Sequence, residues 1–284
     1  MSAAGISSSK SVLITGATSG IGRALALAIA ELPSKPQVIA AGRRESRLEE
    51  LAKRGLETVS LDLRNDKDAL KKDLNNVVEK YTELDTIVLC AGIQHEFDFT
   101  NPEALDIDNL YEEIHVNYTS VVLSVIYLLP QLQKLAVSPI FSWQPDIYAP
   151  LTSIQAQGRS CSVIIITSGL SMVPAAWVPN YSATKAALHS FSMSLRAQMS
   201  GTNINVVEVI PPLVESELHD AYGMTERLSK YWMSLDDFIG QLMPQLINGT
   251  AEVPIGMAET IFTKFEAGKM DIASNIATKH KEGK

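Results

Sequence analysis

Tyr181 and Lys185 stand four residues apart, a spacing that places both side chains on one face of a helix. A tyrosine ionises near pH 10, so it serves as an acid–base group at neutral pH only where a nearby cation favours its phenolate. Lowering that pKa by about 3 requires about 4 kcal/mol, much of which a paired lysine in a shielded site could supply. The same spacing occurs in any amphipathic helix, so the interpretation depends on the surrounding residues.

Ser168 supplies that context, because it lies 13 residues before Tyr181 and directly follows the apolar, β-branched segment 163–167. The segment predicts a strand, and ligands of open α/β sheets bind at the carboxyl ends of strands. A hydroxyl at that position can hydrogen-bond a substrate carbonyl. The three residues together indicate proton transfer to or from a carbonyl or alcohol.

A glycine-rich run, Thr-Gly-Ala-Thr-Ser-Gly-Ile-Gly at 15–22, follows the first apolar segment and opens the first helical pattern. Such glycines let the backbone turn sharply and approach a pyrophosphate, while the helix N-terminus offers free N–H groups and a positive dipole end. The position between strand and helix favours dinucleotide binding over an ordinary turn. The expected contacts are Gly16, Thr18, Ser19, Gly20, Ile21 and Gly22.

Arg43 and Arg44 follow the second predicted strand, at the end that meets the adenosine ribose in dinucleotide folds. A carboxylate there would bind the ribose hydroxyls and repel a 2′-phosphate. The planar, forked donors of arginine instead suit a phosphate. The pair therefore favours NADP(H) over NAD(H); the alternative is a solvated basic start of a helix.

Alternating elements are expected to position these residues. Apolar segments at 12–15, 38–41, 58–61, 86–89, 163–167 and 204–210 predict strands. Helical patterns at 21–31, 45–53, 66–80, 110–132, 181–199 and 258–265 separate or follow them. This order predicts a single α/β domain, a Rossmann-like doubly wound parallel sheet with helices on both faces.

Three regions depart from the alternation. Residues 1–10 are small and polar and predict a flexible lead-in to a domain over 11–284. Residues 136–160 carry three prolines and no clear period, which predicts an inserted loop. Residues 211–250 begin with two prolines and are expected to form a cap over the substrate.

Composition limits the functional classes. The chain has 284 residues, 24 basic and 32 acidic, and a net charge of −8, which argues against a nucleic-acid partner. The apolar run 121–129 is too short to cross a membrane, and no targeting segment is evident. Cys90 and Cys161 are expected to be reduced thiols. We therefore expect a cytoplasmic protein without membrane or metal.

The chain resembles the short-chain dehydrogenase/reductase superfamily, in its common branch, over about residues 10–215. The resemblance rests on Thr15-Gly16-x-x-x-Gly20-x-Gly22, on Ser168, and on Tyr181-x-x-x-Lys185. Asn117, in the sequence His-Val-Asn, matches the family's fourth catalytic residue. Together these motifs are highly specific.

The resemblance implies a mechanism. Tyr181 would be the general acid in reduction and the base in oxidation, and Lys185 would bind the nicotinamide ribose and lower the tyrosine pKa. Ser168 would orient the carbonyl and stabilise oxyanion charge, and Asn117 would hold a water that links Lys185 to solvent. Homodimers or homotetramers would form through 110–132 and 181–199.

The resemblance also implies further cofactor contacts. Asp62 would meet the adenine amino group, Ser19 the phosphate and Ile21 the nicotinamide. The remaining expected contacts are Leu63, Cys90, Ala91, Gly92, Tyr181, Lys185, Pro211, Val214 and Ser216.

Two of these positions depart from the family's pattern. Cys90 stands where the family commonly has an asparagine that braces the sheet, and Pro212 replaces a glycine, which stiffens the start of the cap.

The sequence thus predicts an NADP(H)-dependent oxidoreductase that moves a hydride between nicotinamide and a small carbonyl or alcohol. The alternatives are an NADPH-binding regulatory or scaffold protein without turnover, and an isomerase or dehydratase on the same fold. The expected pocket lining favours an apolar or aromatic ketone: Phe97, Phe99, Met172, Trp177, Tyr222, Tyr231 and Trp232. His95 and Glu96 could border that pocket, whereas His115, His189 and His219 are interpreted as structural or solvated.

Overall fold

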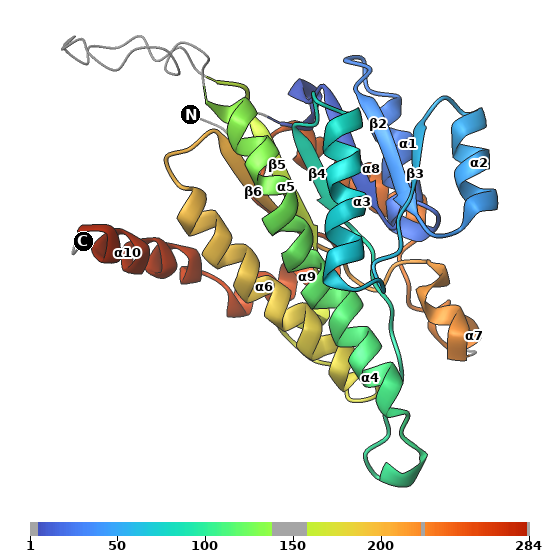
Figure 1. Ribbon diagram of the computed structural model, residues 1–284. Helices are drawn as coiled ribbons and strands as arrows, with labels where there is room; N and C mark the ends of the chain where they lie inside the picture. Colours follow the sequence, from blue (N-terminus) through green and yellow to red (C-terminus); the bar gives the residue numbers. More distant parts are fainter. Residues whose placement is uncertain (1–4, 138–157, 223–224, 283–284) are drawn as a thin grey trace, which may run out of the picture.

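A seven-stranded parallel sheet forms the centre of the computed structural model, which describes residues 5–137, 158–222 and 225–282 (Figure 1). The strand order is β3-β2-β1-β4-β5-β6-β7, so strands are added on one side of β1 up to β3 and on its other side from β4 onward. The strands are β1 (Ser11–Thr15), β2 (Gln37–Gly42), β3 (Glu57–Ser60), β4 (Thr86–Leu89), β5 (Cys161–Ile166), β6 (Ile204–Ile210) and β7 (Glu252–Pro254). This is the doubly wound sheet that the sequence predicts.

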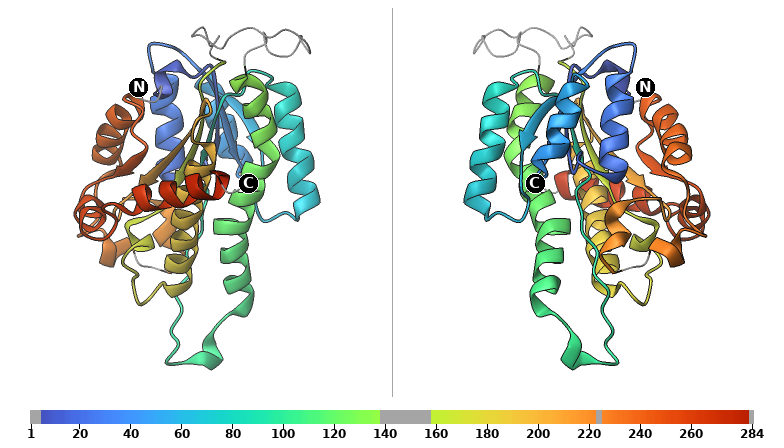
Figure 2. Two further views of the ribbon diagram at one scale, coloured as in Figure 1. Left: turned by 90° about the vertical axis from the view of Figure 1, so that its left-hand side faces the viewer. Right: turned by 90° about the vertical axis from the view of Figure 1, so that its right-hand side faces the viewer.

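Helices cover both faces of the sheet, which explains why its central strands are apolar along their whole length (Figure 2). One face packs on α3 (Lys67–Lys80), α5 (Ser120–Ala136) and α6 (Pro179–Met199). The other packs on α1 (Gly20–Ala30), α2 (Glu45–Lys53) and α8 (Leu235–Ile247). Each face has its own buried apolar cluster, and the two form one domain around the shared sheet.

Polar caps fix where several helices begin. The side chain of Asp66 accepts hydrogen bonds of 2.9 Å from the N–H groups of Asp68 and Ala69 at the start of α3. Asp106 caps α4 (Ile107–Ile114) and Ser234 caps α8 in the same way. A side-chain oxygen at this position satisfies N–H groups that have no partner inside the helix, so each cap stabilises its helix by about 1 kcal/mol.

The predicted helix 110–132 is instead three consecutive elements over Ile107–Ala136. A π-helical turn, His115–Thr119, joins α4 to α5 and contains Asn117. This tract is long and apolar enough to span a membrane, but one side of α5, through Val121, Val125 and Leu128, is buried in the core. We therefore interpret it as a core helix.

The structure corrects several predicted boundaries. Ile6 is buried against the α1–α8 layer, so the fold begins before residue 11 and the lead-in is shorter than expected. In α8, Phe238, Leu242 and Leu246 are core residues, which restricts any cap to the residues between 211 and 234. Residues 138–157 of the expected insertion lie outside the described residues.

Two elements were not predicted at all. Strand β7 has three residues and pairs only with β6, and it is too short to show a pattern. Helix α10 (Lys269–Glu282) follows the predicted helix α9 (Met257–Phe265) and projects from the body of the molecule (Figure 1). Because α10 is mostly polar, it shows no apolar periodicity from which a helix could be predicted.

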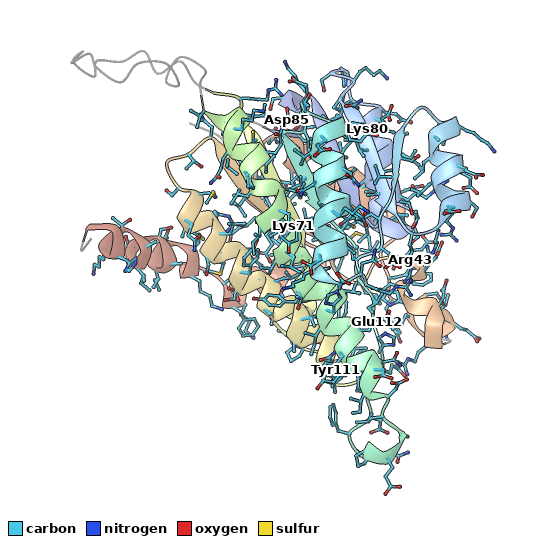
Figure 3. All side chains as sticks on the ribbon, in the orientation of Figure 1. Arg43, Lys71, Lys80, Asp85, Tyr111 and Glu112 are labelled. Carbon is cyan, nitrogen blue, oxygen red and sulfur yellow. The ribbon has the colours of Figure 1, made fainter. Side chains whose placement is uncertain are left out.

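The two edges of the sheet differ in chemistry. Figure 3 shows Asp85 at the amino ends of the strands, where its carboxylate accepts a 2.9 Å hydrogen bond from the Lys10 N–H. Arg43, in the loop after β2, and Glu112, on the helix over Ile107–Ile114, lie toward the opposite end. Because all the strands are parallel, the predicted site residues gather at that carboxyl edge.

Candidate active site

One cavity of about 770 Å³ runs along the carboxyl edge of the sheet. It joins the loop after β1, the loops after β2 to β6, and the segment that begins at Pro211. Every catalytic and cofactor-binding residue predicted above lines this cavity except Asn117, which is fully buried behind the wall. Residues from distant parts of the chain are therefore brought together as the sequence predicts.

The glycine-rich loop is tightly packed against its own chain. Gly16 has a φ of +69°, and a Cβ there would lie 2.8 Å from the Ala91 Cα. A Cβ on Gly22 would lie 2.5 Å from the Gly16 carbonyl oxygen. Ser19, the N-cap of α1, makes no side-chain cap, and Ser19, Gly20 and Ile21 all line the cavity. The start of α1 thus presents a helix N-terminus to the cavity, which fits a pyrophosphate.

Arginines stand at the end of the cavity that lies beside the loop after β2. Arg43 and Arg44 both line it, and the Arg44 Nη1 is 3.1 Å from the Glu217 Oε2. Arg47, which the sequence argument passed over, lies 2.5 Å from the other oxygen of Glu217. The loop after β2 therefore concentrates guanidinium groups where a 2′-phosphate would need them, and a carboxylate of the segment after β6 already binds two of them.

Asp62 and Leu63, after β3, form the next part of the wall. The Asp62 carboxylate accepts hydrogen bonds of 3.0 Å from the Arg64 N–H and Nε. A side-chain hydrogen bond from Arg64 lowers the pKa of Asp62, although burial opposes that effect. Asp62 is thus a fixed carboxylate beside the position expected for the adenine.

Tyr181 and Ser168 face each other across the reactive end of the cavity. Tyr181 lies in the first turn of α6, and Ser168 directly follows β5. The Ser168 Oγ accepts a 3.1 Å hydrogen bond from the Leu170 N–H. Burial raises the pKa of Tyr181, and a hydrogen bond with Ser168 opposes the rise.

In the structure burial dominates the pKa of Tyr181, and the buried Glu113 adds to the rise. The expectation that Lys185 lowers this pKa when the cofactor is bound stays a prediction. The Lys185 Nζ lies 5.5 Å from the centre of the Tyr181 ring and donates a 3.0 Å hydrogen bond to the Ile166 carbonyl. Tyr181 is therefore a protonated phenol at neutral pH, the form that can donate a proton.

Lys185 and Asn117 lie close together behind Gly92. A Cβ on Gly92 would stand 3.3 Å from the Asn117 Oδ1 and 3.7 Å from the Lys185 Nζ. Asn117 forms two 2.8 Å hydrogen bonds with the backbone of Ile93. Burial lowers the pKa of Lys185 to about 8, against the attraction of nearby acidic groups. The π-helical turn thus uses Asn117 to fix the loop after β4, as π-bulges at functional sites often do.

Cys90 takes part in the same loop through its backbone. The Cys90 N–H donates a 3.1 Å hydrogen bond to the Thr15 Oγ1, which also accepts one of 3.3 Å from Ala91. Burial raises the pKa of the Cys90 thiol to about 12, so the thiol stays protonated. The threonine therefore braces β1 against β4 without the family's asparagine.

The far end of the cavity has a mixed lining. Gln94 and His219 are buried and hydrogen-bonded, with 3.1 Å between the Gln94 Oε1 and the His219 Nδ1. Of the seven residues expected to line the substrate pocket, Trp177 and Tyr231 do so among the described side chains. Phe97 is buried in the protein instead, and Phe99 is exposed. Ala258 and Ile261 of α9 add apolar surface that was not predicted.

Sequence reasoning missed several polar residues of the site, among them Arg47, Gln94, Glu113 and Glu217, and it gave His219 only a structural or solvated role. Arg47 is spaced like a surface residue of an amphipathic helix, and Glu217 lies in a segment without periodicity. Glu113 shares its helix with exposed acids such as Asp108, so only burial distinguishes it. Among the described residues, no group of His, Cys, Asp or Glu is arranged to hold a metal ion.

Comparisons with known proteins agree with this architecture. A short-chain dehydrogenase from Sphingobium yanoikuyae in complex with NADPH has a TM-score of 0.72 at 20% identity and covers 93% of this chain and 95% of its own. A 3-ketoacyl-(acyl-carrier-protein) reductase from Brucella melitensis complexed with NADH has a TM-score of 0.69 at 20% identity, covering 86% and 95%. Both likenesses identify the fold class, a Rossmann-like doubly wound parallel sheet.

Sequence comparison identifies the family. A family model described as short chain dehydrogenase matches residues 10–140 and 147–227. The chain is 32% identical over 247 residues to an uncharacterized oxidoreductase, DltE, from Bacillus subtilis, covering 85% of this chain and 86% of that one. It is 29% identical to sulfoacetaldehyde reductase 2 from Chromohalobacter salexigens, covering 72% and 73%. The chain belongs to the short-chain dehydrogenase family of oxidoreductases.

Proposed function

We propose that this protein is an NADP(H)-dependent reductase of a small ketone or aldehyde. One observation carries the proposal: a single cavity connects Arg43, Arg44 and the glycine loop to Ser168, Tyr181 and Lys185. One end has the groups that bind a phosphorylated dinucleotide, and the other has a proton donor and a carbonyl-orienting hydroxyl. A binding protein without turnover would not need the second set.

The residues of the cavity fit a nicotinamide dinucleotide. The α1 N-terminus would hold the pyrophosphate, Arg43 and Arg44 the 2′-phosphate, and Asp62 the adenine. Around the nicotinamide half we place Pro211, Val214 and Ser216. When bound, the cofactor supplies or accepts a hydride. Of the two solved structures of the same fold, one is a complex with NADPH and the other with NADH, so the preference for NADP(H) rests on the arginines.

The chain's own groups then handle the proton. Tyr181, which is protonated at neutral pH, donates its phenolic proton to the carbonyl oxygen as negative charge develops there. Ser168 donates a hydrogen bond to the same oxygen and fixes its position. Lys185 provides a cation beside the developing phenolate, and Asn117 holds the surrounding loop.

The substrate is a small molecule with apolar surface and at least one polar group besides its carbonyl. Trp177, Tyr231 and Ile261 would contact the apolar part, and the Gln94–His219 pair would meet the polar part. We also propose a cytoplasmic location and a homodimer or homotetramer formed through the α4–α5 tract and α6.

The test is NADPH oxidation, followed at 340 nm, over a panel of ketones and aldehydes, with NADH in parallel. The proposal predicts turnover with NADPH at a higher kcat/KM than with NADH for the same substrate. Saturable NADPH binding without turnover on the whole panel would favour the regulatory alternative. Failure to bind either nucleotide would refute both.

A further inference from the structure

Glu113 is a carboxylate with no solvent exposure beside the catalytic residues. It lies in the last turn of α4, four residues before Asn117. Taking a carboxylate out of water is unfavourable unless hydrogen bonds and an opposite charge compensate. The fold therefore holds Glu113 there through specific partners, and those partners indicate its role.

Two hydrogen bonds link Glu113 to both sides of the reactive end of the cavity. Its Oε1 accepts one of 2.8 Å from the His95 N–H, in the loop after β4 that lines the cavity. Its Oε2 accepts one of 2.5 Å from the Nδ2 of Asn180, the residue directly before Tyr181. Glu113 therefore ties the first turn of α6 to the opposite loop.

Charged and titratable groups from α4, α6 and the loop after β4 surround this carboxylate. Lys185, on α6, is the opposite charge with which it interacts. Tyr181 is the acid whose ionisation it opposes. Burial raises the pKa of Glu113 itself to about 7, so the group is anionic on the alkaline side of neutrality. Cys90, in the loop after β4, also acts on Lys185, while Glu112 of α4 acts on His95, whose pKa burial lowers. Lys185 is therefore the cation through which Glu113 acts.

We propose that Glu113 is a positioning residue of the active site, which fixes Tyr181 relative to the loop after β4 and keeps Lys185 in its cationic form. The inference rests on the proposed function, because it deepens the roles given to Tyr181 and Lys185. The hydrogen bonds of Glu113 and its negative charge have separate effects. The bonds set the geometry of proton donation, and the charge sets the pH range over which the site works.

The two effects separate in a pair of substitutions. Glu113→Gln removes the charge with little change in shape, although one amide N–H must then face a former donor. Asn180→Ala removes the hydrogen bond to Glu113, together with a 3.3 Å bond to the Leu110 carbonyl, and leaves the carboxylate. Asp108→Asn is the matched control, because Asp108 is an exposed acid on the same helix. Thermal unfolding of each variant reports whether it is folded.

Two profiles of each variant are measured against pH: NADPH affinity by fluorescence, and kcat with KM for the best panel substrate. Glu113→Gln is expected to lose about 10- to 100-fold in kcat. It should also move the alkaline limb of NADPH binding to lower pH by about one unit, because Lys185 loses its proton more easily. Asn180→Ala should lower kcat without moving that limb, and Asp108→Asn should match the wild type.

The binding profile keeps the inference distinguishable from the proposed function. A wild type that binds NADPH but turns nothing over would defeat the reductase proposal, while the shift of the binding limb would still support the role of Glu113. A folded Glu113→Gln protein with the wild-type kcat and binding limb would overturn the inference. A limb that moved equally in Asp108→Asn would overturn it too, because the effect would then not be specific to the buried carboxylate.

Discussion

His189 offers a sharp test of the structure, because it is an imidazole between two buried carboxylates. It lies on α6, one turn after Lys185. Its Nδ1 is 2.9 Å from the Glu208 Oε1, and its Nε2 is 3.0 Å from the Glu266 Oε2. Glu208 belongs to β6, and Glu266 follows α9. The imidazole therefore joins the sheet to the C-terminal part of the chain.

The contribution of His189 to the free energy of unfolding follows from its pKa. Burial lowers the pKa of His189, but hydrogen bonds and attraction from Glu208 and Glu266 outweigh burial and raise it to about 9. A rise from 6.5 to about 9 corresponds to about 3 kcal/mol of folding free energy. Because the folded-state value is the higher one, this stabilisation is fully present below pH 6.5. It is lost as the pH rises through about 9.

The assay is urea unfolding of the wild type and of His189→Gln from pH 6 to pH 10. Lys185, whose pKa burial lowers to about 8, stabilises the fold with rising pH over part of that range. It does so in both proteins, so the difference between their free energies of unfolding reports on His189 alone. We expect that difference to fall by about 3 kcal/mol between pH 6.5 and pH 9.5.

His280→Gln is the control, because His280 is an exposed imidazole on α10. The free energy of unfolding of His280→Gln should stay close to that of the wild type at every pH. A His189→Gln difference that did not change with pH would refute the reasoning, since the imidazole would then titrate as it does in the unfolded chain.

Two further predictions concern the cofactor. Arg44→Ala should weaken NADPH binding about tenfold and leave NADH binding unchanged, because a charge-assisted bond to the 2′-phosphate is lost; isothermal titration measures both, with the exposed Arg54→Ala as control. Glu217→Gln should tighten NADPH binding about threefold relative to NADH, because it releases Arg44 and Arg47 from a half-exposed carboxylate. If Glu217→Gln tightened NADH binding to the same extent, the 2′-phosphate would not be the group that the released arginines bind.

The sequence was sufficient for the sheet and for most of the candidate site residues that line the cavity. Six of the seven strands and the main helices follow from apolar periodicity, because each packs against a large partner. Gly16 and Gly22 signal the tight loop, since backbone conformation and close packing leave no room for another residue. Ser168 and Tyr181 meet because parallel strands end at one edge.

The site features that the sequence did not predict depend on burial in the folded protein, which local sequence patterns do not reveal. Glu113 and His189 look like surface residues in the sequence, yet one is fully buried and the other joins two carboxylates. The sequence shows Lys185 as an influence on the pKa of Tyr181, but it does not show how deeply the phenol is buried. The structure adds desolvation, which dominates.

The most direct test of the account is Tyr181→Phe in the NADPH oxidation assay, with NADPH affinity measured on the same sample. The substitution removes only the phenolic hydroxyl, so the account predicts retained NADPH binding with kcat reduced at least about 100-fold. Tyr127→Phe, on α5 and outside the cavity lining, should behave as the wild type. A Tyr181→Phe protein that reduced the same carbonyl at the wild-type rate would contradict the account, since the proton would then come from another group.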